Sequence, residues 1–129
     1  MLPRQARMKR PADFRCAVRE GRRAGRPALT GHLFVPSVGA EDGTVRPDES
    51  AKVGFIVSRA VGSAVVRNRV KRRLRDLIRG HLGSLPAGSL FVVRANPAAA
   101  SAHQADLAAD LDLVLARLLR RQVGTLHRQ

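Results

Sequence analysis

Apolar and polar residues follow a two-residue period in several short segments of this chain, which predicts strands. The clearest is KVGFIVS at 52–58, where alternation predicts Val53, Phe55 and Val57 toward the core and Gly54, Ile56 and Ser58 on the other face. LTGHLFVPSV at 29–38 and SLFVVRA at 89–95 are two further strands, bounded by Pro36 and by Asn96-Pro97. A fourth, short strand at 22–26 has weak support.

Other segments have the three-to-four-residue spacing of amphipathic helices. A short helix is predicted over 11–20, with Pro11 and Asp13 in its first turn and Gly21 at its end. A second is predicted over 63–80 with Ser63 as N-cap, and a third begins at Ser101. One apolar stripe runs along this last helix and comprises Leu107, Leu111, Val114, Leu115 and Leu118. This order predicts an α+β fold, a two-layer sandwich of a small, about four-stranded sheet with three helices.

The length of 129 residues predicts a single domain, 1–129. Residues 1–10 are basic with little apolar periodicity, so we expect a mobile tail. The Gly-, Pro- and acid-rich segment 39–50 is a predicted flexible loop, and 121–129 a frayed tail.

The formal charge of +14 indicates a polyanionic partner, because self-repulsion of this size weakens a compact state that has none. Nucleic acid is the default partner of such a domain, with membrane surfaces as the competing polyanion. The single cysteine excludes a disulfide framework. No secretory signal and no run of about 20 apolar residues is present, so the chain is interpreted as a cytoplasmic protein with no membrane partner.

The predicted helix at 63–80 carries most of the clustered charge. Val66, Val70 and Leu74 recur at steps of four inside the run VVRNRVKRRLRD, which predicts a helix docked on a core with its cations pointing in fixed directions. A solvated charged face would normally mix signs, yet only Asp76 is acidic between 67 and 79. Asn68, between two arginines, is expected to hold an arginine or a backbone group at the helix start.

A catalytic constellation is harder to find. Glu41, Asp42, Asp48 and Glu49 fall in the predicted loop, while Asp106 and Asp110 are placed on the outside of the last helix. The histidines lack metal-ligand spacing, and Cys16 is interpreted as a packing residue. No catalytic or metal-ligating residue is therefore predicted, and the partner is expected to supply any catalysis.

The string KVGFIVSRAVGSAVVRNRVKRRLRD at 52–76 resembles the protein component of bacterial ribonuclease P. The match comprises Val57-Ser58-Arg59, Gly62, Ala64-Val65, Arg67-Asn68-Arg69, Lys71-Arg72 and Arg75, and extends more weakly over about 4–120. The resemblance implies a left-handed βαβ crossover around the basic helix. It also implies a subunit that binds ribonuclease P RNA and precursor tRNA and assists removal of the 5′ leader. The Mg²⁺-dependent chemistry would belong to the RNA, and no obligate protein partner is expected.

The same resemblance assigns two sets of site residues. The first, facing the catalytic RNA, is Arg59, Arg67, Asn68, Arg69, Lys71, Arg72 and Arg75. The second, gripping the single-stranded leader between the first helix and the sheet, is Phe14, Val18, Thr30, His32, Ile56 and Ser58.

Three positions depart from the family's pattern. Val18 and His32 stand where aromatic residues are usual, and Arg59-Ala60 replaces a pair of lysines. Since stacking on aromatic rings contributes about 1–3 kcal/mol per base, a leader would depend more on Phe14, His32 and arginine planes. An ordinary surface histidine is the other interpretation of His32. For the whole chain, the alternatives are a general RNA-binding or ribosomal protein and a protein-only nuclease.

Overall fold

The computed structural model describes residues 2–36 and 50–127, with side chains described as far as residue 119. Most of the predicted loop at 39–50 lies outside these residues. The helices are α1 (Pro11–Glu20), α2 (Ala64–Arg79) and α3 (Gln104–His127), with short 3₁₀ turns η1 (Arg4–Ala6), η2 (Leu82–Ser84) and η3 (Pro97–Ala100). The strands are β1 (Arg22–Gly25), β2 (Leu29–Phe34), β3 (Lys52–Ile56) and β4 (Leu90–Ala95).

The strands form one mixed sheet in the order β1-β2-β4-β3. β1, β2 and β4 pair antiparallel, whereas β3 and β4 are parallel neighbours connected through α2. This arrangement confirms the four-stranded α+β prediction, including the weakly supported first strand. The strands end earlier than predicted, at Phe34 and Ile56.

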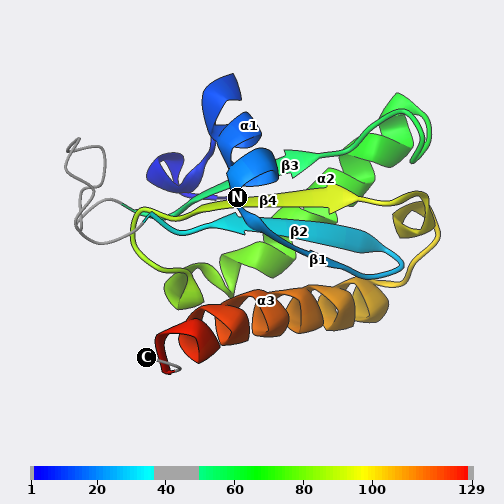
Figure 1. The fold of residues 1–129 in the computed structure, drawn as a ribbon. Helices are drawn as coiled ribbons and strands as arrows, with labels where there is room; N and C mark the ends of the chain where they lie inside the picture. Colours follow the sequence, from blue (N-terminus) through cyan, green and yellow to red (C-terminus); the bar gives the residue numbers. More distant parts are fainter. Residues whose placement is uncertain (1, 37–49, 128–129) are drawn as a thin grey trace.

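Helices cover both faces of the sheet (Figure 1). The larger apolar cluster lies between the sheet and helices α2 and α3, where Leu29, Phe91 and Val93 are fully buried. The smaller cluster lies under α1 and joins Ala17 to Val92 and Met8. The predicted two-layer sandwich is therefore the sheet with α2 and α3, and α1 adds a small layer opposite.

The N-terminal segment is packed, which corrects the prediction of a mobile tail over 1–10. Leu2, Ala6 and Met8 are buried, and the backbone N–H of Met8 donates to the carbonyl oxygen of Val53 at 2.9 Å. Arg7 and Val53 thus form a parallel bridge along the outer edge of β3. Three apolar residues spread over seven positions give no detectable period, so sequence pattern alone missed this contact.

Helix α3 lies along the sheet and buries the whole predicted stripe. It begins at Gln104, and Ser101 instead ends η3, so the predicted cap is wrong. Its backbone is helical to His127, which extends it beyond the start of the predicted frayed tail. None of the helices in the described part of the chain is long and apolar enough to cross a membrane.

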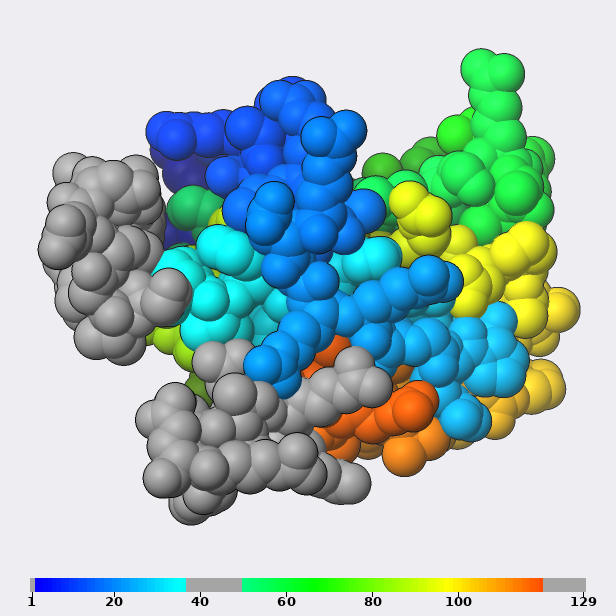
Figure 2. Space-filling model, viewed as in Figure 1, coloured from blue at the N-terminus to red at the C-terminus, as the bar shows by residue number. Residues whose placement is uncertain are grey.

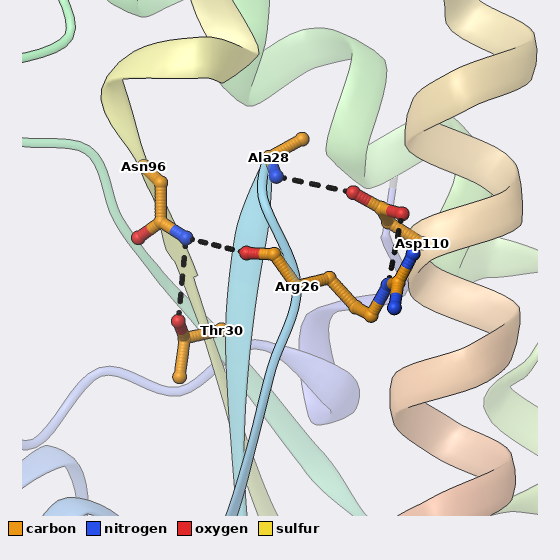
Figure 3. Close-up of polar contacts among 5 residues, drawn as sticks. All are labelled: Arg26, Ala28, Thr30, Asn96 and Asp110. Atoms are coloured by element: carbon orange, nitrogen blue, oxygen red, sulfur yellow. Dashed lines mark hydrogen bonds and ion pairs between the residues drawn. The ribbon is translucent and has the colours of Figure 1, made fainter.

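Asp110 of α3 corrects another prediction, because its carboxylate is buried against the turn between β1 and β2 (Figure 3). The backbone N–H of Ala28 donates to one oxygen at 3.1 Å, and Arg26 Nε donates to the other at 3.3 Å. On the far side of the turn, Asn96 Nδ2 donates to the Arg26 carbonyl oxygen at 2.9 Å. The first contact gives the buried Ala28 N–H an acceptor, and the last gives the Arg26 carbonyl oxygen a donor at this turn.

Candidate nucleic-acid interface

Helix α2 is anchored as the sequence predicted. The Ser63 hydroxyl accepts from the Val66 backbone N–H at 3.3 Å, which confirms the N-cap. Val70, Leu74 and Ile78 are completely or almost completely buried against the core. Because this stripe holds the helix in one orientation, the cations on the remaining face have fixed directions.

The charges on α2 do not all serve the same purpose. Arg73 donates to the Ala102 carbonyl oxygen at 3.2 Å and so ties α2 to the start of α3. Arg79 lies 3.7 Å from Asp76, the one acid of the run. The predicted RNA-facing residues are the remainder: Arg69, Arg72 and Arg75 are exposed, Arg67 and Lys71 are half-buried, and Arg59 is exposed just before the helix.

Asn68 does not behave as predicted. Its side chain is exposed, and within the described residues no hydrogen bond joins it to an arginine or to the backbone. By contrast, the Nε–H of Arg67 is buried with no acceptor among the described residues. Asn68 therefore presents its amide to solvent beside the arginines, where both its donor and its acceptor can meet a ligand.

The predicted leader residues of the sheet lie on the α1 face. Strand alternation turns Thr30 and His32 toward this face, since Leu29, Gly31 and Leu33 pack into the larger cluster. The register sets Arg23 beside His32 and Arg94 beside Thr30. Sequence reasoning missed both arginines, although the alternation of Leu90, Val92 and Arg94 is a signal that could have identified Arg94.

Helix α1 brings the remaining leader residues to the same face. Phe14, Val18 and Ile56 pack around one small apolar cluster. Gly54 makes this possible, because a Cβ there would stand 2.4 Å from Cε1 of Phe14. Ser58 lies past the end of β3, in the connection to α2, and is exposed. The space-filling view shows a hollow between α1 and this connection (Figure 2).

Two of the predicted contact residues are buried rather than open. Thr30 is 6% exposed, and its hydroxyl accepts from Asn96 Nδ2 at 3.4 Å. His32 is also 6% exposed, so its interpretation as a surface histidine is wrong. Burial, followed by the positive charges of Arg94 and Arg23, lowers the pKa of His32. Its Nδ1 is buried with no hydrogen-bond partner among the described residues. The lowered pKa favours the neutral ring, which lies beneath the exposed arginines Arg23 and Arg94.

Groups suited to catalysis or metal binding are dispersed. No three His, Cys, Asp or Glu side chains in the described residues converge on a point that could hold a metal ion. His81 Nε2 lies 2.9 Å from Asp112, which joins the end of α2 to α3. Burial, and then Glu20 and Asp13, raise the pKa of Cys16, so its thiol is a poor nucleophile.

Comparison with known proteins yields one consistent family. Residues 2–119 match the family described as Ribonuclease P. The chain is 57% identical over 122 residues to the ribonuclease P protein component of Streptomyces avermitilis, covering 92% of this chain and 96% of that protein. It is 53% identical over 130 residues to that of Thermobifida fusca, covering 99% and 86% respectively.

Solved structures share the fold at lower identity. The ribonuclease P protein of Staphylococcus aureus superposes with a TM-score of 0.69 at 22% identity, covering 85% of this chain and 92% of that one. The Thermotoga maritima ribonuclease P protein, in complex with 1-(4-fluorophenyl)-2-thiourea, superposes with a TM-score of 0.68 at 21% identity. The match covers 86% of this chain and 98% of that one.

Proposed function

The chain belongs to the ribonuclease P protein family, and we propose that two separate faces of the molecule contribute to tRNA 5′ maturation. As a ribonuclease P protein it acts in a ribonucleoprotein whose other component is ribonuclease P RNA. The division is between α2, which holds that RNA, and the α1 face of the sheet, which holds the 5′ leader of precursor tRNA.

The observation that carries the first assignment is the buried stripe of α2. With Val70 and Leu74 in the core, Arg69, Arg72 and Arg75 project from a fixed helix, and none of the three is paired with an acidic side chain of the described residues. Planar guanidinium groups bind phosphate oxygens in two-point fashion. Each phosphate neutralised on a single strand adds about 0.7 to the salt exponent, so assembly is steeply salt-dependent.

The α1 face suits a short unpaired strand. It offers the apolar groups Phe14, Val18 and Ile56 beside the exposed arginines Arg23 and Arg94. Bases can pack on the apolar side chains while the arginines contact phosphates or stack on bases. The buried ring of His32 lies beneath the surface of this face and forms part of its floor.

The catalytic groups are assigned to the RNA, together with the Mg²⁺ that the reaction requires. Several acids of the described chain are already engaged in the fold, since Asp110 contacts Arg26, Asp112 contacts His81 and Asp76 contacts Arg79. Converging carboxylates on rigid elements are what two-metal hydrolysis needs. The complex works in the cytoplasm, with precursor tRNA as substrate and with neither a membrane nor an obligate protein partner.

Reconstitution tests this proposal. Purified protein is mixed with ribonuclease P RNA of the same organism, and release of the 5′ leader from precursor tRNA is followed at low Mg²⁺. We expect the protein to stimulate cleavage and to cleave nothing alone. Absence of stimulation would contradict the proposal, and cleavage by the protein without RNA would assign the chemistry to the protein.

A further inference from the structure

A pocket of about 360 Å³ opens where the N-terminal segment, β3 and α2 meet. Its volume lies within the range of about 300–1,000 Å³ that is usual for small-ligand sites. Only one of its lining residues, Phe14, belongs to the predicted leader set, and the pocket contains none of the sheet residues of that set.

The wall formed by the N-terminal segment is held in place. The Met8 N–H donates to the Val53 carbonyl oxygen at 2.9 Å, and Lys52 Nζ donates to the Gln5 carbonyl oxygen at 3.2 Å. Arg7 Nε donates to the Leu2 carbonyl oxygen at 3.0 Å, which orients the guanidinium group. The pocket is therefore built from ordered backbone.

The lining combines an apolar floor with a cationic rim. Met8, Phe14 and Phe55 supply polarisable and aromatic surface, and a Cβ at Gly54 would intrude on both Phe14 and Met8 Sδ. The rim carries Arg7 and Lys9 from the N-terminal segment, and Lys71 and Arg75 from α2. Among the residues that the structure describes, none that lines the pocket is acidic, so the cations repel one another until an anion enters.

We propose that this pocket binds one nucleotide of an RNA strand. The base lies against Met8 and Phe14, and its phosphate is bound between Arg7 and the α2 cations Lys71 and Arg75. A simple anion would use the rim and leave the floor unused, whereas a neutral aromatic molecule would leave the charges unpaired. This nucleotide subsite lies between the two RNA-binding faces and adds to the proposed function. The proposal rests on that function in one respect, namely that the nucleotide belongs to an RNA strand.

The test is an NMR titration of the ¹⁵N-labelled protein alone, with 5′-AMP, adenosine, inorganic phosphate and the dinucleotide ApA as probes. We expect 5′-AMP and ApA to shift amide signals of residues 7–9, 53–55, 71 and 75, with adenosine and phosphate binding at least about tenfold more weakly. Chemical-shift changes confined to other residues, or inorganic phosphate binding as tightly as 5′-AMP, would overturn the proposal that this pocket binds a nucleotide. Binding of 5′-AMP without ApA would overturn the assignment to an RNA strand.

Matched variants then test the contacts. Arg7→Gln should weaken 5′-AMP binding about tenfold, because it removes a charged donor. Arg4→Gln removes the same charge from η1, outside the pocket, and should have little effect. Equal losses of 5′-AMP affinity in both variants would mean that the overall positive charge of the protein, and not this pocket, holds the nucleotide. Since the titration contains no ribonuclease P RNA, failure here with successful reconstitution would overturn the pocket and leave the proposed function standing.

Discussion

Replacing Asp110 with alanine tests how α3 holds the turn between β1 and β2. The change removes the acceptor for the Ala28 N–H, which lies in a residue only 4% exposed, and the partner of Arg26. A buried donor left without an acceptor costs about 1–3 kcal/mol. The Arg26 side chain is 39% exposed, so its ion pair adds at most about 1 kcal/mol.

The two contributions predict that Asp110→Ala lowers the free energy of unfolding by about 1–4 kcal/mol. For a domain of this size, that loss lowers the melting temperature by roughly 3–16 °C. Urea unfolding followed by circular dichroism measures the first quantity, and a thermal scan the second. Asp110→Asn keeps one acceptor oxygen and should lose less than the alanine variant.

Asp106 provides the matched control, because it is exposed in the first turn of the same helix. Asp106→Ala loses only an interaction with the helix dipole, about 0.3–1 kcal/mol. If the Asp110 and Asp106 variants are destabilised equally, the buried contact with Ala28 contributes nothing beyond helix electrostatics, and the reasoning is refuted.

Four further predictions concern the two faces. Gly54→Ala should displace Phe14 and Met8 and lower stability by about 1–3 kcal/mol in urea unfolding. Phe14→Ala should weaken precursor tRNA binding to the reconstituted complex by about 1–3 kcal/mol while leaving mature tRNA binding unchanged, because only the precursor carries the leader that stacks there. Arg69→Ala should weaken assembly with ribonuclease P RNA about tenfold or more in filter binding, through loss of a charged phosphate contact. Stability should fall as pH drops below 6.5, because the pKa of buried His32 lies below that value and the unfolded chain therefore binds the proton first; His32→Gln should flatten this slope in unfolding measured across pH.

Two of these variants have a matched control on the same chain. A Cβ at Gly83 would meet nothing within 4 Å, so Gly83→Ala should be nearly neutral. Arg117 is exposed on α3, so Arg117→Ala should leave assembly unchanged. Equal effects in variant and control would contradict the site-specific explanation, and parallel losses for precursor and mature tRNA would show that Phe14 is not a leader contact.

Periodicity was sufficient for the elements that bury one clear face. The stripes of α2 and α3 and the alternation in β3 were predictable because their apolar residues repeat over several turns or positions. The N-terminal segment was not, since its position depends on pairing with Val53, far away in the chain. Asp110 was also placed wrongly, because its burial depends on a turn of β1 and β2 that helical periodicity cannot see.

The candidate site was predictable to a similar degree. The cations of α2 could be placed from helical spacing, and Phe14, Val18 and Ile56 do meet on one face. The burial of His32 and its two neighbouring arginines required the register of β2 with β1 and β4, which no local pattern specifies. The pocket joins Arg7 to Arg75 and needed the complete fold.

The strand order has a consequence for how the chain is made. β4, at 90–95, lies between β2 and β3 and pairs with both of them. The β1–β2 hairpin and β3 therefore cannot join into one sheet until residue 95 has left the ribosome. Until then the β1–β2 hairpin and β3 each expose an unpaired edge, which promotes association with other chains. The sheet therefore closes late in synthesis, through contacts distant in sequence, and such topologies fold slowly. A nascent chain halted before residue 90 should bind chaperones and resist folding, whereas release of β4 should complete the sheet in one step.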